Sequence, residues 1–235
     1  MMYSLLCKIT LLLVYIQFSV SQTTPFKEIE ALEALYNNTN GEKWESVNVL
    51  NVMFLYENLD LFIGVPWDFT KSSDGSTYLY DPCNYPIDGG FSHFVGIHCV
   101  CSIECNVDLL WLNYAKLNGT LPKEIGQLNS LTMIDLANNN IHGSIPREIQ
   151  SLVNLTKFDV SSNDIDGTIP PEITKLTKLQ VLQLNDNNIN STIPSSIGQL
   201  TNLKVLYLQN NSFQCRHTIY FLISHMAICI HSFSL

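Results

Sequence analysis

The chain has 235 residues, a length that suits one domain with flanking segments. Acidic residues outnumber basic ones by 21 to 12, which gives a net charge of −9. An acidic chain repels phosphate backbones and anionic membrane surfaces, so we exclude nucleic acid as a partner.

The segment 1–21 has the features of a secretory signal peptide. Lys8 is its only charged residue, an apolar run covers 9–18, and a Ser-Val-Ser triplet at 19–21 offers small residues for cleavage. The alternative is a membrane anchor, but the apolar run is short for a span. We therefore expect a mature chain that begins near Gln22, is secreted or lies on the outer face of the plasma membrane, and carries a net charge near −10.

The first predicted element of the mature chain is an amphipathic helix. Thr24 and Pro25 predict a capped start of this helix with proline at its first position, which suits proline. The apolar residues at helical spacing are Ile29, Leu32 and Tyr36. The helix should end near Asn40-Gly41, because these residues favour a turn.

Six cysteines follow the predicted cleavage site: Cys83, Cys99, Cys101, Cys105, Cys215 and Cys229. An even number in a secreted chain favours disulfide bonds. A zinc site is the alternative, because His93 and His98 lie near three of these cysteines in the sequence. The C-x-C-x(3)-C spacing fits the usual zinc pairs only loosely, so we expect no metal and no other cofactor.

Residues 107–214 repeat with a period of 24. The unit reads L-x-x-L-x-L-x-x-N-x-[LI]-x-G-x-[LI]-P-x-x-I-x-x-L-x-x, and its proline recurs at Pro122, Pro146, Pro170 and Pro194. The units are 107–130, 131–154, 155–178, 179–202 and the partial unit 203–214. A period of this size is typical of a solenoid.

A single unit cannot fold alone, because ordering each residue costs about 1–2 kcal/mol of backbone entropy while each buried apolar side chain returns only roughly 1.5–3 kcal/mol. Stacked units cover each other, so the array is stable. The L-x-L pairs predict strands of one parallel sheet on the concave side. The asparagine amide should bind backbone groups where the chain turns, and P-x-x-I-x-x-L should form a short helical turn on the convex side.

The unit L-x-G-x-I-P-x-x-I-G-x-L resembles the plant-type class of extracellular leucine-rich repeats. That class occurs in receptor-like-kinase ectodomains, polygalacturonase-inhibitor proteins and surface proteins of protists. Ser191 departs from the pattern in place of a glycine, and Ala115 in place of an asparagine. The resemblance implies an α/β solenoid, a right-handed superhelix with a parallel concave sheet.

The resemblance extends to the region before the repeats. The stretch 31–44 and the motifs P-W-D-F (66–69), D-P-C-N (81–84) and G-I-H-C (96–99) look like the N-terminal cap of these proteins. We therefore expect a helical, disulfide-bonded cap over 22–106. The resemblance implies a Cys83–Cys99 bond, which leaves Cys101–Cys105 as the simplest second bond.

In proteins of this class partners usually dock on the outward strand positions. The candidate ligand-binding residues are Trp111, Asn113, Tyr114, Asp135, Asn138, Asp159, Gln183, Asp186 and Tyr207. The aromatic residues are of a kind enriched at interfaces, and the acidic centre suits a basic protein or peptide, or a hydroxyl-rich glycan of a cell wall or cell surface. Alternatively, Trp111 packs under the cap and the acidic residues form a solvated face.

Asp135 and Asp159 lie on neighbouring predicted strands about 4.8 Å apart, close to the carboxylate spacing of about 5–5.5 Å in retaining glycosidases. The face is open, however, and the sequence shows no pocket or other catalytic motif. We predict that the chain is not an enzyme.

Five N-x-S/T sequons predict glycosylation of a secreted chain, at Asn37, Asn118, Asn154, Asn190 and Asn210. Asn210 is the least suited, because a glycan there would stand on the predicted binding face. The hydrophobic tail 215–235 has three interpretations: a C-terminal cap with a Cys215–Cys229 bond, a membrane or lipid anchor, or an accident of the gene model.

These features predict a recognition or adhesion module that binds through the concave face, either free or as a co-receptor. Two alternatives stay open. One is an inhibitor of a secreted polysaccharide hydrolase, which rests only on the family resemblance. The other is a truncated receptor ectodomain.

Overall fold

The computed structural model describes residues 24–43, 85–87, 90–92, 97–101, 105–213 and 227–229. The predicted signal peptide, Cys83, His93, Cys215 and most of the tail lie outside these residues, as do the motifs at 66–69 and 81–84. Predictions about them therefore stay predictions. No helix in the described part of the chain is long and apolar enough to cross a bilayer.

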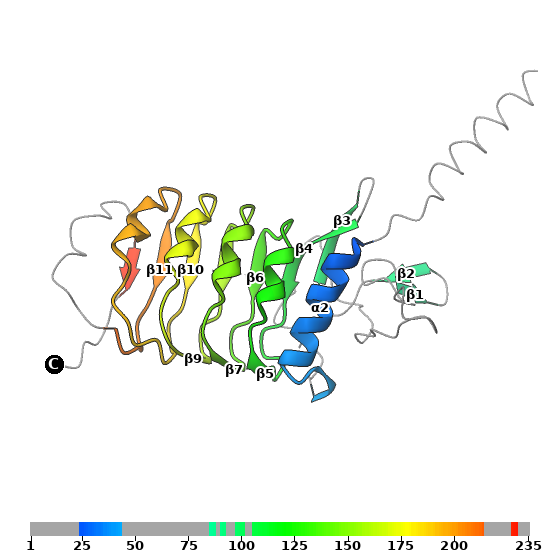
Figure 1. Ribbon diagram of the computed structural model, residues 1–235, viewed down its shortest axis with the longest axis horizontal. Helices are drawn as coiled ribbons and strands as arrows, with labels where there is room; N and C mark the ends of the chain where they lie inside the picture. Colours follow the sequence, from blue (N-terminus) through cyan, green and yellow to red (C-terminus); the bar gives the residue numbers. More distant parts are fainter. Residues whose placement is uncertain are drawn as a thin grey trace, which may run out of the picture.

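A seven-stranded sheet runs the length of the stack (Figure 1). Its strands are β3 (Ile97–Cys101), β4 (Cys105–Trp111), β6 (Met133–Asp135), β8 (Lys157–Asp159), β10 (Val181–Gln183), β11 (Val205–Tyr207) and β12 (Ala227–Cys229). Within this sheet, β4, β6, β8, β10, β11 and β12 pair in parallel, and β3 pairs antiparallel with β4. Neighbouring strands pair in register one repeat apart, as Leu110 does with Ile134, so the predicted period and parallel sheet are confirmed.

Each repeat makes one coil, and we number the coils one to five from residue 107. The inward residues of the strands form one continuous core from coil to coil. Its central column is almost fully buried and consists of Leu110, Ile134, Phe158, Leu182 and Leu206. Because each side chain lies against its counterpart in the next coil, the array buries apolar surface that a single repeat would leave exposed.

The asparagine ladder works as the sequence predicts. The Asn163 carboxamide accepts a hydrogen bond from the N–H of Ile141 at 2.9 Å and donates to the carbonyl of Leu136 in the preceding coil at 3.0 Å. It also donates to the carbonyl of Val160 within its own coil. Asn139, Asn187 and Asn211 repeat this pattern. The buried amides therefore tie consecutive coils together.

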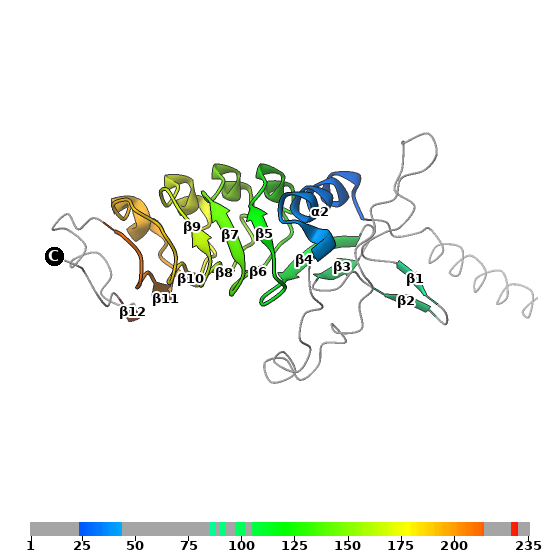
Figure 2. The same ribbon diagram turned by 90° about the horizontal axis from the view of Figure 1, so that it is seen from below.

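On the other side of the coils, each periodic proline immediately precedes a short 3-10 helix, and Figure 2 shows these helices opposite the seven-stranded sheet. They are η3 (Lys123–Gln127), η4 (Arg147–Ser151), η5 (Pro171–Lys175) and η6 (Ser195–Gln199). The predicted helical turn is thus confirmed.

Between the two sides lies a second parallel sheet that the repeat pattern did not lead us to expect. Its strands are β5 (Asn118–Thr120), β7 (Asn140–Gly143) and β9 (Asp164–Ile165). They lie in coils one to three, where the N–H groups of Leu117, Ile141 and Ile165 donate to the ladder asparagine of the next coil. The sheet adds a further set of hydrogen bonds between coils.

Helix α2 (Phe26–Asn38) packs against η3 and β5 at the N-terminal end of the stack. Pro25 is its N-cap rather than its first helical residue, and no side chain caps the helix, which corrects the predicted start. The helix is followed by η1 (Gly41–Lys43). A separate hairpin joins β1 (Tyr85–Ile87) and β2 (Gly90–Ser92).

Two backbone contacts join α2 to the first coil. The fully buried Glu28 accepts a hydrogen bond from the N–H of Val107 at 2.9 Å. Past the helix end, the carbonyl of Thr39 accepts one from Asn118. Gly119 is required beside this contact, because a Cβ there would overlap the carbonyl oxygen of Asn38. Polar groups of the helix therefore cover the backbone edge of the first coil.

Cys99 and Cys105 are both disulfide-bonded. The side chains of their predicted partners, Cys83 and Cys101, are not among those that the structure describes, so the pairing remains a prediction. At the other end of the sheet, β12 pairs with β11 and thereby covers the outer edge of coil five.

Candidate functional site

The outward side of the seven-stranded sheet, the concave face, carries the candidate residues in columns. Residues one repeat apart lie side by side, as the pairing of Asp135 with Asp159 and of Gln183 with Tyr207 shows. The parallel ladder continues past the strands, where the N–H of Asp186 bonds the carbonyl of Gln209 at 2.9 Å. Hydrogen bonds between coils therefore hold the columns in fixed register.

The N-terminal part of the face is covered. Trp111 is 3% exposed and belongs to the core, while Asp135 and Asp159 are each 5% exposed. Met133, which lies next to them, is also buried. These side chains contribute to packing, and a partner would not meet them on an open surface.

The C-terminal part of the face is more open. Gln183 and Tyr207 are half-buried, and so are Val181 and Val205, which precede them by two residues on the same face. Asp186 is also half-buried and lies just beyond the end of its strand. On the strands themselves, the side chains that a partner can reach are thus concentrated on coils four and five.

Lys157 sits between the two buried carboxylates. Its Nζ lies 2.7 Å from Asp135 Oδ2 and 3.4 Å from Asp159 Oδ2. The other carboxylate oxygens accept hydrogen bonds from the N–H groups of Ala137 and Ser161. One ammonium is therefore shared by two carboxylates, and the three groups keep a single net negative charge.

The pKa values of this cluster follow from burial and pairing. Burial raises the pKa of Asp135 above its ordinary 3.8; Lys157 opposes this shift, and the neighbouring Asp159 adds to it. Burial alone lowers the pKa of Lys157, but the attraction of Asp135 and Asp159 and their hydrogen bonds outweigh it, so the pKa is raised above 10.5. Lys157 is thus held in the charged form.

Lys157 was absent from the candidate residues derived from the sequence. The alternation of side chains along a strand could have identified Lys157, because a residue two positions before Asp159 must point to the same face of the strand. Its register neighbour is Met133, an apolar residue, so the column does not read as polar. The two aspartates that were expected to attract a basic partner are thus already paired with Lys157 of the same chain.

A further column forms the rim where each strand ends. It consists of Tyr114, Asn138, Ser162, Asp186 and Asn210, all with φ between 53° and 58°. Asparagine and aspartate tolerate this left-handed conformation, whereas a bulky residue rarely adopts it. Tyr114 is the exception and is 58% exposed, so its ring stands free at the N-terminal end of the rim. Asn113, next to it, is half-buried.

Asp186 organises its neighbours on the rim. Its Oδ2 accepts a hydrogen bond from Asn185 Nδ2 at 2.6 Å, and its Oδ1 accepts one from Asn210 Nδ2 at 2.5 Å. The side-chain amide oxygens Asn185 Oδ1 and Gln209 Oε1 are covered and accept no hydrogen bond within the described structure. This part of the rim therefore presents hydrogen-bond acceptors that lack a donor.

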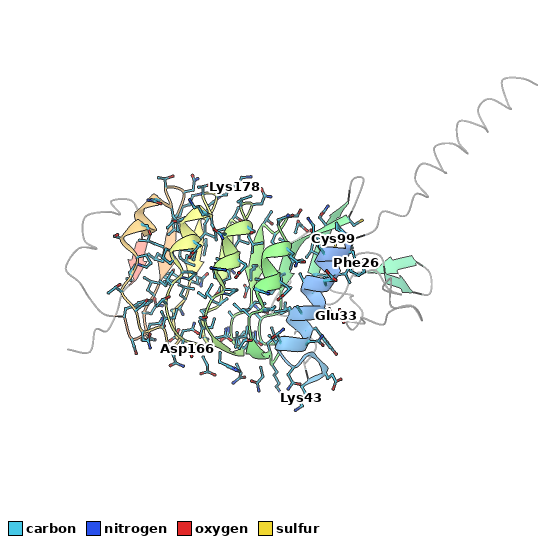
Figure 3. The ribbon with its side chains drawn as sticks, in the orientation of Figure 1. Phe26, Glu33, Lys43, Cys99, Asp166 and Lys178 are labelled. Atoms are coloured by element: carbon cyan, nitrogen blue, oxygen red, sulfur yellow. The ribbon has the colours of Figure 1, made fainter. Side chains whose placement is uncertain are left out.

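The sequons lie on different sides of the stack. Asn37, Asn118 and Asn190 are exposed; Asn37 lies near the end of α2, Asn118 in β5 and Asn190 in coil four. The Asn154 amide donates to the carbonyl of Asn129 and accepts from Lys178, which lies on the side of the short helices (Figure 3). Asn210 is exposed but engaged with Asp186. No cluster of three or more potential metal ligands occurs among the described side chains.

Two sequence families, both described as leucine-rich repeats, match the chain. One covers residues 168–213, and the other covers 130–152 and 154–176. A comparison with curated proteins finds no match.

Solved structures show the same fold. The ectodomain of the receptor kinase SOBIR1 from Arabidopsis thaliana is similar with a TM-score of 0.56 at 19% identity, over 82% of this chain and 84% of that chain. The PEPR1–AtPEP1 complex gives 0.55 at 26% identity over 79% of this chain, but the match spans only 21% of that chain. The BIR3–SERK2 complex from Arabidopsis thaliana gives 0.55 at 25% identity, over 79% and 82%. The chain therefore has the leucine-rich-repeat fold and resembles the ectodomains of plant receptor kinases.

Proposed function

We propose that the chain is a non-catalytic extracellular recognition module that binds a protein or peptide partner through the concave face. The observation that carries the proposal is the row of half-exposed outward side chains on coils four and five. They stand on strands whose backbone groups are already paired, so a partner meets a preorganised surface and causes little loss of freedom on binding.

The comparisons support this choice of partner. PEPR1 was solved with AtPEP1, and BIR3 with SERK2. Both complexes are between polypeptides. A glycan partner and the inhibition of a polysaccharide hydrolase rest on the sequence alone.

The proposal also places the chain outside the cell, as the signal-peptide features and the sequons indicate. The bonded state of Cys99 and Cys105 agrees with an oxidising compartment. Non-reducing peptide mapping of the secreted chain should recover the Cys83–Cys99 and Cys101–Cys105 bonds. A different pairing would contradict the resemblance that implies them.

A displayed library of random dodecapeptides tests the binding face. The full chain should select peptides, and a concave variant, Gln183→Ala with Tyr207→Ala, should bind them at least tenfold more weakly. The control is Val153→Ala, which changes a side chain exposed outside the concave face. Equal binding by both variants would exclude coils four and five, and the absence of any selected peptide would reject peptide recognition.

A further inference from the structure

Charge is distributed unevenly along the concave face. In coils two and three, both carboxylates already share Lys157, and all three groups are held in place. In coils four and five, Asp186 is the only formally charged side chain among the described outward positions of the strands and rim. Asp186 accepts only amide donors from Asn185 and Asn210, so its negative charge has no cation beside it within the described structure.

Asp186 also sets the direction of the amides around it. A carboxylate can only accept hydrogen bonds, so the neighbouring amides must turn their NH2 groups toward it. The side-chain oxygen Asn185 Oδ1 therefore points away from Asp186, and it has no donor within the described structure; the side-chain oxygen Gln209 Oε1 in the next coil has none either. An acceptor left without a donor is costly, and a donor supplied by a ligand would remove that cost.

Apolar and aromatic groups border these acceptors. Val181 and Val205 lie side by side on the same face, and Tyr207 follows on β11. Aliphatic stems of long basic side chains pack well on such surfaces while the charged end reaches a polar group. The face of a tyrosine ring also attracts a cation.

We infer that coils four and five select a peptide with a basic side chain, whose guanidinium or ammonium group binds at Asp186 beside Asn185 and Gln209. A guanidinium is all donor and no acceptor, so it supplies both the missing charge and the missing donors. Among the described outward positions of coils four and five, a ligand carboxylate would find no cation. A neutral glycan would leave the charge of Asp186 uncompensated. The inference rests on the proposed function and specifies its partner.

The peptide library supplies the test. Peptides selected by the unmodified chain should be enriched in arginine and lysine. Replacing the arginine of a selected peptide by citrulline, its neutral isostere, should weaken binding at least tenfold. Asp186→Asn should cause a similar loss for the arginine peptide and little further loss for the citrulline peptide, because the two changes remove the same contact. Higher salt should weaken only the arginine peptide.

The matched control is Asp166→Asn, an exposed acidic residue at the edge of the coils, far from Lys178 in Figure 3. It should bind the arginine peptide like the unmodified chain. Asparagine already occupies the position of Asp186 in coils two and five, so the variant should fold. The comparison of the arginine and citrulline peptides uses the unmodified chain, so it does not depend on whether a variant folds.

Four results would overturn the inference. Selected peptides without basic enrichment, or equal binding of arginine and citrulline peptides, would do so and leave peptide recognition intact. Equal effects of Asp186→Asn and Asp166→Asn would show that the preference for basic peptides comes from the net negative charge of the chain and not from a contact with Asp186. A library that yields no peptide at all, with binding only on a neutral oligosaccharide array, would reject the proposed function together with the inference.

Discussion

Replacing Asn139 by alanine should destabilise the whole array. The side chain is 9% exposed and joins coils one and two. Its oxygen accepts from the N–H of Leu117 at 3.0 Å, and its NH2 group donates to the carbonyls of Leu112 at 2.8 Å and Leu136 at 2.9 Å. Alanine removes all of these contacts, and its methyl group fills only part of the space.

The expected cost follows from these bonds. Each hydrogen bond contributes about 1 kcal/mol net, and a buried group left unpaired costs about 1–3 kcal/mol. Leu117 is fully buried, so its N–H cannot turn to water in the folded chain. We expect the free energy of unfolding to fall by roughly 3–4 kcal/mol, a large share of the roughly 5–15 kcal/mol of a typical domain.

Urea unfolding of the purified chain measures this change, provided that the slope with denaturant stays constant. The control is Asn140→Ala, the next residue, which is exposed and whose side chain makes no hydrogen bond that we observe. It should change the free energy of unfolding by no more than about 0.5 kcal/mol. Asn139→Asp adds a second test: it keeps the shape but turns an oxygen toward the carbonyls of Leu112 and Leu136, so it should be at least as damaging at neutral pH. Equal effects of the two alanine variants would refute the ladder as a source of stability.

Three further predictions concern charged groups. Lys157→Met should cost about 2–3 kcal/mol in urea unfolding, because it strands two buried carboxylates, whereas the exposed Lys178→Met should be nearly neutral. Burial raises the pKa of Asp135, so the folded chain binds this proton at higher pH than the unfolded chain; the unmodified chain should therefore gain stability relative to Asp135→Asn as the pH falls from neutral toward 3.8. A gain in the opposite direction would contradict the assignment. Glu28→Ala should cost about 1–3 kcal/mol and speed proteolysis of helix α2, and the exposed Glu30→Ala should do neither.

The sequence by itself determined the stack. Leucines, asparagines and prolines at a fixed spacing specify a core column, a ladder of side-chain amides and a short helix in every coil. Because each residue packs against its own counterpart in the next repeat, the spacing alone states which residues meet. The parallel sheet and its register could therefore be predicted before any coordinates were known.

Only the tertiary structure decided what each outward side chain does. Trp111 and Asp135 were candidate binding residues, with packing under the cap as the alternative for Trp111, and the structure buries both. Lys157 neutralises part of the acidic centre, whereas Asp186 has no cation beside it within the described residues of the concave face. The second sheet also emerged only in three dimensions. Exposure and charge pairing depend on groups that different coils and the N-terminal region bring together, and no repeat pattern records those encounters.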